Sequence, residues 1–334
     1  MALGWGIVGT GTASDRLVGP GIAADPESEL VAIVSRDEGR AKEFAAKHGA
    51  RRAYTHYEDL LADSEVDVVY IATPNALHAE QAISAAEAGK HILCEKPLAM
   101  TTDDALRVVE AARAHEVKLG TNFQTRHFAP VEEIKRVIEA GEIGELLVVQ
   151  AESSAGANPL RGWRTDAGLA GMGTVNNIGV HPLDVVRYLL GSEVREVAAM
   201  TDAGHRDELE TLALVLLRFE NGTLAYVNAN QKVPVPQQDL EIYGTKGMIL
   251  GRNCTRPGLD SEVTVRTTDG ERKTQSSTRD GFHRAVAAFN RAILEDRTPS
   301  ASGEDGLRSV EVVEAIRTSA RSGTIVQLAS RALV

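Results

Sequence analysis

The sequence predicts an α/β protein in which a doubly wound parallel sheet is followed by an α+β domain with a large, mainly antiparallel open sheet. A glycine-rich turn at residues 9–14 lies between an apolar run and a helical stretch. Short apolar strands then alternate with helices as far as residue 121, which is typical of a parallel sheet. Longer strands without this alternation follow residue 123. We therefore expect one domain at residues 1–123 and a second at residues 124–334.

Length and composition limit the possible functions. A chain of 334 residues exceeds one ordinary core, so two domains are expected. The formal net charge of −11 argues against a surface for nucleic acid or anionic membrane. Cys94 and Cys254 are the only cysteines, so neither a disulfide framework nor a metal site is expected. Without a signal peptide or transmembrane run, we expect a soluble cytoplasmic protein.

The first strand and its turn predict a dinucleotide site. Leu3–Val8 reads as a buried parallel strand. Gly9 permits a tight turn, and Gly11 lets the backbone approach a pyrophosphate at the amino terminus of a helix. Ser14 stands where a third glycine is usual, and is still small enough for close packing of helix on strand. Thr10, Thr12 and Ala13 complete the candidate loop. The alternative is a tight connection that binds nothing.

The end of the second strand, Glu29–Val34, bears on which dinucleotide binds. An NAD site normally has an acidic residue there for the ribose 2′-hydroxyl. Here Ser35 and Arg36 follow the strand, with Arg40 one helical turn on, and these groups suit a 2′-phosphate. Asp37 and Glu38 allow the opposite interpretation, because either could hold a 2′-hydroxyl or pair with the arginines. We favour NADP over NAD.

The remaining elements of the first domain continue the alternation. Expected strands cover residues 52–54, 67–72, 91–94 and 117–121, and expected helices cover residues 40–48, 78–88 and 103–115. Parallel strands place their carboxyl ends at one edge of the sheet. The loops that begin at Gly9, Ser35, Thr73, Glu95 and Asn122 should therefore lie along that edge, where an extended cofactor could contact each of them.

The turn after the strand at residues 91–94 carries a candidate catalytic group. Lys96 can move a proton, and Glu95 can orient it. Pro97 fixes its own φ, which restrains the backbone at Lys96. Chain statistics do not favour a cis bond before Pro97. Taken alone, the tripeptide is equally that of a solvated lysine on a loop.

The second domain should contain a mainly antiparallel sheet. Expected strands cover residues 146–153, 194–200, 211–219, 222–230 and 239–243. Expected helices at residues 130–140, 280–295 and 303–321 would cover it. The polar stretch at residues 266–279 is expected to be an exposed loop. An open sheet with one uncovered face often hides that face in an oligomer, so a homodimer or homotetramer is expected.

A glycine-rich stretch at residues 168–184 leads into a second candidate site. Asn177, His181 and Asp184 are spaced so that a helix would place them on one face. Pro182 cannot donate to the carbonyl of Ile178, so the helix should kink or restart there. Each polar residue also has a simpler explanation, as a cap, a first-turn charge or a satisfied core group.

Four motifs together resemble the glucose–fructose oxidoreductase/inositol dehydrogenase/MocA (Gfo/Idh/MocA) family. They are Gly9-Thr10-Gly11, Ala72-Thr73-Pro74-Asn75 with His78, Glu95-Lys96-Pro97, and Gly179-x-His181-x-x-Asp184, in this order. The resemblance spans nearly the whole chain. It implies a Rossmann domain followed by an α/β domain with a large open sheet, a nicotinamide cofactor, and a sugar, polyol or keto-sugar substrate.

The resemblance also implies roles for individual residues. Lys96 matches the family's catalytic lysine and His181 its catalytic histidine. Positions that contact the cofactor in the family correspond to Thr73, Pro74, Asn75, His78, Glu95 and Asn122. Trp163-Arg164 resembles a cofactor-reaching segment of one branch, the NADP-dependent 1,5-anhydro-D-fructose reductases. This chain departs from the family at Asn177, where aspartate is frequent, and from that branch at Phe282, where a substrate-side tyrosine is usual.

The resulting hypothesis is hydride transfer between nicotinamide and a sugar carbon, without a metal. His181 would donate the proton, Lys96 would stabilise the developing alkoxide, and Asn177 and Asp184 would hold substrate hydroxyls or the imidazole. One competing hypothesis is a sensor that binds the cofactor without turnover. Another is a scaffold, which would leave the glycine turn and the arginines at positions 36 and 40 unexplained.

Overall fold

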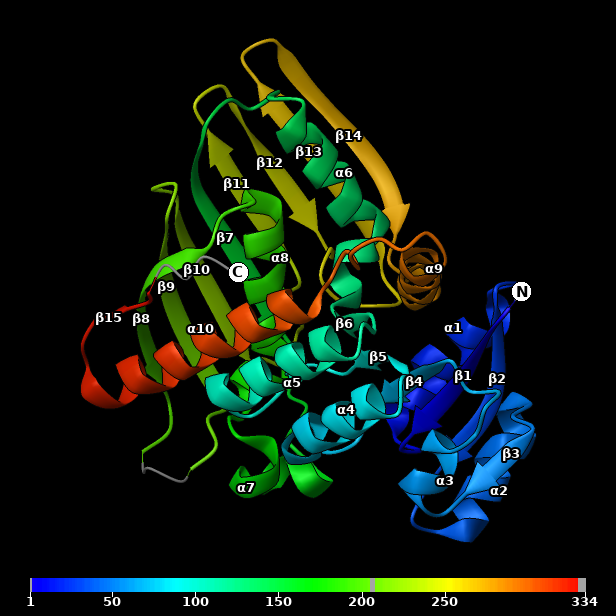
Figure 1. Cartoon of the computed structure of the whole chain (residues 1–334). Helices are drawn as coiled ribbons and strands as arrows, with labels where there is room; N and C mark the ends of the chain where they lie inside the picture. The colour runs from blue at the N-terminus through cyan, green and yellow to red at the C-terminus, as the bar shows by residue number, and fades with distance from the viewer. Residues whose placement is uncertain (1, 205–207, 330–334) are drawn as a thin grey trace. The chain divides into compact units, whose positions relative to one another are not determined.

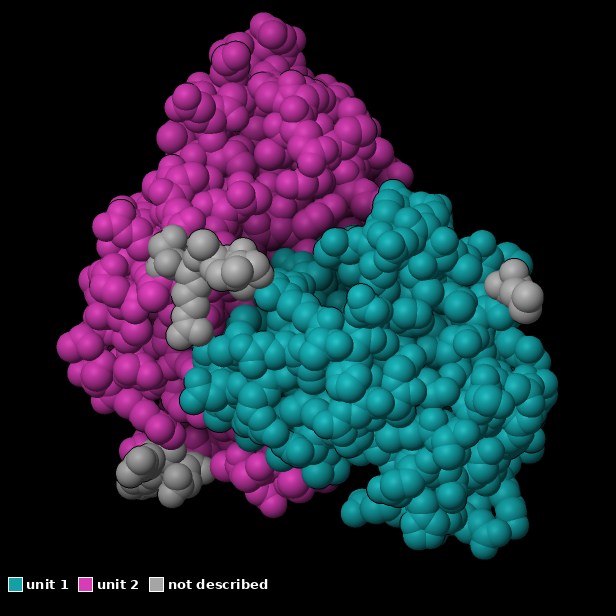
Figure 2. All heavy atoms as spheres, in the orientation of Figure 1, with its two compact units in different colours: residues 1–123, 282–307 teal, residues 124–281, 308–334 magenta. Residues whose placement is uncertain are grey.

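A computed structural model describes residues 2–204 and 208–329, which form two compact units. The first unit contains residues 1–123 and 282–307, and the second contains residues 124–281 and 308–334 (Figures 1 and 2). The chain passes from one unit to the other after Phe123 and returns to the first unit for residues 282–307.

The first unit is built on a six-stranded parallel sheet with the order β3-β2-β1-β4-β5-β6. This confirms the predicted doubly wound sheet, since the chain runs outward from β1 in one direction and then from β4 in the other. The strands are β1 (Leu3–Val8), β2 (Ser28–Val34), β3 (Arg52–Tyr54), β4 (Val68–Ile71), β5 (His91–Cys94) and β6 (Leu119–Thr121).

Helices cover both faces of this sheet. Trp5 and Ile7 of β1 pack on one face with Val18, Ile22 and Phe44, which belong to the helices that follow β1 and β2. A Cβ at Gly6 would lie on the other face, next to Leu60. The helices are η1 (Ser14–Val18), α1 (Gly19–Ala24), α2 (Glu38–His48), α3 (Tyr57–Leu61), η2 (Asn75–Leu77), α4 (His78–Glu87) and α5 (Thr102–Ala114).

Helix α9 (Gly281–Leu294) belongs to this core and not to the second sheet. The ring of Phe289 meets that of Trp5 edge-on, with centroids 6.1 Å apart, and Phe282 and Val286 join the same cluster. Asn290 accepts a hydrogen bond from the Trp5 indole at 3.2 Å. The prediction that this helix covers the second sheet is therefore wrong. Its apolar face is complementary to either sheet, and only long-range packing decides between them.

The second unit contains a nine-stranded sheet with the order β14-β13-β12-β11-β7-β10-β9-β8-β15. All neighbours are antiparallel except β7 and β10, so the sheet is mixed but mostly antiparallel. The strands are β7 (Leu146–Ser154), β8 (Val194–Thr201), β9 (Leu212–Phe219), β10 (Leu224–Asn230), β11 (Leu240–Gly244), β12 (Gly247–Arg252), β13 (Asp260–Thr267), β14 (Gly270–Ser277) and β15 (Val326–Gln327).

The predicted exposed loop at residues 266–279 is instead the edge hairpin of β13 and β14. Residues Asp260–Thr267 pair in register with residues Gly270–Ser277. An edge strand with polar side chains on both faces has no apolar alternation, which is why the sequence pattern did not reveal β14.

Among the described elements, helices pack on one face of the nine-stranded sheet and leave the other face bare (Figure 1). The covering helices are α6 (Ala129–Glu139), α8 (Val180–Leu190) and α10 (Gly303–Ser322), with the shorter η3 (Gln124–His127), η4 (Gly162–Thr165), α7 (Ala167–Ala170) and η5 (Val175–Gly179) in the connections. On the bare face, Met200 is 77% exposed and Leu216 is 59% exposed. None of the helices in residues 2–204 and 208–329 has both the length and the apolar composition needed to cross a membrane.

Candidate functional site

The glycine turn after β1 has the geometry that a phosphate-binding turn requires. Gly9 has φ +102°, and a Cβ there would lie 2.6 Å from the carbonyl oxygen of Ala72. A Cβ at Gly11 would have no neighbouring protein atom within 4 Å, so this side of the turn is open to a ligand. Helix hydrogen bonding begins with the amide of Asp15, which donates to Gly11. An anion would bind before this amide, where the turn leads into the helix, so the turn fits a dinucleotide phosphate.

The end of β2 leaves two guanidinium groups available. Asp37 does not pair with them: its side chain caps α2 by accepting from the Arg40 amide at 2.8 Å. Glu38 pairs with Lys42 at 2.6 Å. Within the part of the chain that the structure describes, Arg36 and Arg40 are exposed and take part in no ion pair. The acidic residues that could have neutralised these arginines are thus occupied elsewhere.

The ladder of the parallel sheet brings the other predicted loops to the same edge. The amide of Gly9 donates to Val34, that of Ala72 to Val8, that of Glu95 to Ile71 and that of Asn122 to Cys94. The candidate loops that begin at Gly9, Ser35, Thr73, Glu95 and Asn122 therefore lie side by side, as the sequence predicted. Thr73 donates to Gln81 at 2.6 Å, and Asn75 is buried.

Glu95 is held by two side chains from neighbouring strands. Its Oε1 accepts from the Tyr70 hydroxyl at 2.5 Å and from the Asn122 amide at 2.7 Å. Burial, followed by the charge of Glu95, raises the pKa of Tyr70 well above its usual value, so the hydroxyl remains a donor. The two hydrogen bonds, from Tyr70 and from Asn122, therefore orient the carboxylate of Glu95. The role of Tyr70 escaped the sequence analysis because a tyrosine inside an apolar strand reads as core.

His78 does not present its ring to a cofactor, which corrects the expectation for this residue. The side chain is fully buried. Its Nδ1 lies 2.7 Å from the carbonyl oxygen of Pro97, and its Nε2 lies 3.0 Å from that of Thr73. Lys96, which precedes Pro97 through a cis bond, is only partly buried. His78 thus joins the loop after β4 to the turn that carries Lys96.

Protonation of His78 should lower stability. Burial lowers the pKa of His78 below its usual 6.5, outweighing its two carbonyl contacts, which raise it. As the pH falls below about 6.5, the unfolded chain takes up a proton that the folded chain refuses, so the free energy of unfolding decreases. Urea titrations between about pH 7.5 and pH 5.5 should show a smaller decrease in His78→Asn than in the wild type. Equal slopes in the two proteins would contradict this assignment.

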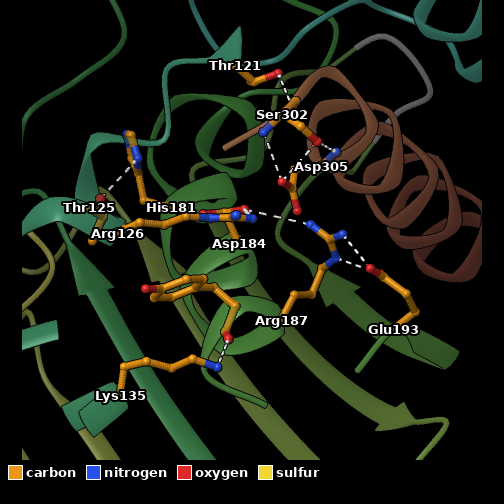
Figure 3. A network of polar contacts seen from close by, with 11 residues as sticks. Thr121, Thr125, Arg126, Lys135, His181, Asp184, Arg187, Glu193, Ser302 and Asp305 are labelled. Carbon is orange, nitrogen blue, oxygen red and sulfur yellow. Dashed lines mark hydrogen bonds and ion pairs between the residues drawn. The ribbon is translucent and has the colours of Figure 1, made fainter. Parts of the chain in front are cut away.

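In the second unit, a π-helical segment leads into the helix that carries the candidate histidine. The segment η5 covers Val175–Gly179 and continues without a break into α8, which begins at Val180. Wider i→i+5 hydrogen bonds accommodate Pro182, which has no amide to donate, so the helix neither breaks nor restarts. His181 and Asn177 are both half-buried, and His181 Nδ1 lies 3.5 Å from the hydroxyl of Thr125 (Figure 3).

Asp184 belongs to a buried network of ion pairs. Its Oδ1 and Oδ2 accept from Arg126 at 2.6 and 2.8 Å, and Arg187 lies 3.7 Å away (Figure 3). The Asp184 carboxylate is fully buried and the Arg126 side chain is 5% exposed. Arg187 continues the network to Glu193 at 2.8 Å. Asp184 therefore anchors the helix of His181 to η3.

Glu210 supports the same helix and was missed by the sequence analysis. Its carboxylate accepts from the amides of Gly173 and Val175 at 3.0 and 2.9 Å, and its carbonyl accepts from the amide of Thr174 at 2.8 Å. An anion at the amino terminus of a helix is favourable. Burial raises the pKa of Glu210, and these amide bonds oppose that rise. Its position outside any expected strand gave no sequence signal.

Trp163 and Arg164 lie on the short helix η4. The Arg164 guanidinium stacks on the Trp163 ring, 4.4 Å from its centroid. Arg164 is exposed and Trp163 is half-buried. These residues, Asn177 and His181 belong to the second unit, whereas Lys96 and the other candidate cofactor residues belong to the first.

Two family profiles match this chain. One, described as "Oxidoreductase family, NAD-binding Rossmann fold", matches residues 3–123. The other, described as "GFO/IDH/MocA C-terminal domain", matches residues 131–250. Together they span most of the sequence and correspond to the first unit's sheet and to much of the second.

Individual relatives are similar over nearly the full length. The chain is 33% identical to a 1,5-anhydro-D-fructose reductase of Ensifer adhaerens, over 97% of this chain and 98% of the relative. It is 34% identical to D-xylose 1-dehydrogenase (NADP(+)) 2 of Haloferax volcanii, over 97% and 99%. Among solved structures, a levoglucosan dehydrogenase in complex with NADH and levoglucosan superposes with a TM-score of 0.89 at 27% identity, covering 98% of this chain and 99% of that one.

Proposed function

Because the chain belongs to the Gfo/Idh/MocA family of oxidoreductases, we propose that it transfers a hydride between a nicotinamide cofactor and a sugar, polyol or keto-sugar. The observation that carries this proposal is the match of the whole chain to sugar dehydrogenases and reductases, combined with an open glycine turn at the carboxyl edge of the parallel sheet. The substrate would be a small carbohydrate. A screen of carbohydrates would identify the individual sugar.

Lys96 and His181 would carry the proton chemistry. When bound, the cofactor supplies or accepts the hydride. In reduction, the imidazolium of His181 would give a proton to the substrate oxygen that gains negative charge and become neutral, and the Lys96 ammonium would donate a hydrogen bond to that oxygen. In oxidation, His181 takes the proton. Asn177 would donate to a substrate hydroxyl. Asp184 would hold the helix of His181 against Arg126.

The cofactor-binding residues would come from the carboxyl edge of the parallel sheet. The proposed set is Gly9, Thr10, Gly11, Thr12, Ala13, Ser35, Arg36, Arg40, Thr73, Pro74, Asn75, Glu95, Lys96 and Asn122, together with Trp163 and Arg164 of the second unit. His78 would contribute indirectly, through the backbone of Thr73.

A test for turnover separates an oxidoreductase from a cofactor sensor. Absorbance of the reduced cofactor would be followed with a panel of ketoses, aldoses and polyols. We expect oxidation or reduction with at least one of them. Tight cofactor binding without turnover across the whole panel would favour the sensor. No cofactor binding would favour the scaffold.

We propose NADP as the preferred cofactor, since Arg36 and Arg40 are exposed and Asp37 and Glu38 are engaged in a cap and an ion pair. Arg36→Ala should weaken NADPH binding about 10-fold, because a charge-assisted hydrogen bond to the 2′-phosphate would be lost. NADH binding should change little. Fluorescence titration of both cofactors measures the two dissociation constants.

Lys118→Ala is the control for this titration, because it removes a paired cation that precedes β6, at the opposite edge of the parallel sheet. It should leave the ratio of the two dissociation constants unchanged. If Arg36→Ala weakens NADH and NADPH equally, or if the wild type prefers NADH, the assignment of the 2′-phosphate socket is wrong.

We further propose that the bare face of the nine-stranded sheet forms a homodimer or homotetramer interface. Leu214 and Leu216 of β9 point outward, and their partners in β8 are Met200 and Ala198. Adjacent exposed apolar side chains of this kind indicate an association surface.

We also propose that the protein is cytoplasmic. Its two cysteines are buried and unpaired, as is usual for proteins of a reducing compartment.

Leu216→Glu should dissociate the oligomer, because it would bury a charge at the centre of the proposed interface. We expect the dissociation constant to rise about 10-fold or more, measured by light scattering after size-exclusion chromatography. Leu294→Glu, the same substitution at an exposed leucine of the first unit, is the control. A monomeric wild type, or equal effects of the two substitutions, would count against this interface.

A further inference from the structure

The residues on either side of Lys96 are both fixed by buried groups of the first unit. On the amino-terminal side, Tyr70 and Asn122 hold the carboxylate of Glu95 at 2.5 and 2.7 Å. On the carboxyl-terminal side, the ring of His78 meets the carbonyl oxygen of Pro97 at 2.7 Å. Lys96 is itself only partly buried. The backbone is therefore held on both sides of Lys96, while the Lys96 side chain can face a ligand.

His78 reaches a second loop with its other nitrogen. Nε2 lies 3.0 Å from the carbonyl oxygen of Thr73, in the loop that follows β4. That loop contains Pro74 and Asn75 and touches the glycine turn, since the backbone of Gly9 closely approaches Ala72. One imidazole thus bridges the cofactor-side loop and the Lys96 turn.

Packing alone does not account for a histidine at this position. The side chain is fully buried at the first residue of α4, where an apolar side chain would avoid the cost of burying a polar ring. Both nitrogens face main-chain carbonyls, but a neutral ring has one N–H and can donate to only one of them. We assign that N–H to Nδ1, whose contact with the carbonyl oxygen of Pro97 is the shorter, so the ring fixes the backbone of the Lys96 turn.

We infer that His78 is a positioning residue that sets the location of Lys96 through its contact with the carbonyl of Pro97. This inference rests on the proposed function, because it requires Lys96 to take part in the reaction. His78 contacts neither substrate nor cofactor in this scheme. It acts through the carbonyl of Pro97, and so on the turn from which the Lys96 ammonium projects.

Two amide variants separate the two contacts of the ring. The amide nitrogen of asparagine can take the place of Nδ1, and that of glutamine can take the place of Nε2. His78→Asn therefore keeps the contact to Pro97, and His78→Gln keeps the contact to Thr73. We expect His78→Gln to lower kcat about 10-fold or more, because a small misplacement of a catalytic group is costly. His78→Asn should stay within about threefold of the wild type, and the dissociation constant of NADPH should change less than about threefold in His78→Gln.

A second measurement asks whether His78 acts through Lys96. His78→Gln would be combined with Lys96→Met, and the slow residual turnover of both Lys96→Met proteins compared. If the effect passes through Lys96, the additional substitution should cost less than about twofold. A purely structural defect would instead multiply the losses and would lower the urea midpoint together with kcat.

The inference is overturned if the two amide variants lose kcat equally, or if the loss in His78→Gln persists in the Lys96→Met background. Should His78→Gln not fold, folded His78→Asn decides the matter, since a tenfold loss of kcat with the Pro97 contact kept would contradict the inference. Near-normal turnover of Lys96→Met alone would instead remove the catalytic role of Lys96, and thereby the proposed mechanism. The two failures are therefore distinguishable.

Discussion

Lys96→Ala and His181→Ala should each lower kcat about 10²–10⁴-fold, the usual contribution of a positioned proton donor or oxyanion partner. The dissociation constant of NADPH should stay within about threefold of the wild type, because neither change touches the glycine turn or the 2′-phosphate socket. Single-turnover absorbance of the reduced cofactor, measured with the best sugar of the panel, gives the rate, and fluorescence titration gives the affinity.

The double variant shows whether the two groups serve one step. If they act on the same substrate oxygen, Lys96→Ala with His181→Ala should be only slightly slower than the worse single variant. Lys90→Ala is a matched control, since Lys90 only donates to the carbonyls of Asp63 and Val66 within the first unit. Near-normal turnover in both single variants would remove these residues from the mechanism.

Arg126→Met should cause the largest loss of stability among the substitutions considered for the second unit. It would leave the fully buried Asp184 carboxylate without its bidentate partner. Removing one member of a buried pair typically costs 3–5 kcal/mol, and we expect about 3 kcal/mol because Arg187 remains 3.7 Å away. The methionine would still pack on Tyr188, whose ring centroid lies 5.0 Å from the guanidinium. Urea denaturation measures the change in the free energy of unfolding.

Pairing this substitution with Asp184→Leu tests the cause. With both charges gone, the stability should return most of the way to that of the wild type, since a buried pair contributes little net stability over an apolar pair. Arg136→Met, which removes an exposed partner of Glu133 on α6, should change the free energy of unfolding far less, because solvent screens an exposed pair. A cost in Arg126→Met no greater than in this control would show that Asp184 does not depend on Arg126.

The first unit was predictable from the sequence because its signals are local. Strand β4 is an unbroken apolar run, and the glycines of the first turn have a conformational reason to be there. The order of strands then places Gly9, Thr73, Glu95 and Asn122 at one edge without further information. The family resemblance supplied the roles of Lys96 and His181, which spacing alone left open.

The missed features depend on partners that are distant in the sequence. The sequence does not show that Arg126 lies beside Asp184, so Asp184 is interpreted there as a charge in the first turn of a helix. Nor does it show that the ring of His78 lies against Pro97 and Thr73, so His78 is interpreted as a cofactor contact. Edge strand β14 has no apolar face, so its pairing with β13 is set by the neighbouring strand and not by its own composition. Helix α9 could have covered either sheet.

The return of residues 282–307 to the first unit has a consequence for synthesis. The amino-terminal sheet leaves the ribosome early, yet the aromatic face of α9 that packs on Trp5 is translated only after residues 124–281 of the second unit. Until then, the nascent protein exposes an apolar surface that chaperones could bind. The two units therefore cannot mature one after the other, and completion of the first awaits synthesis of most of the second.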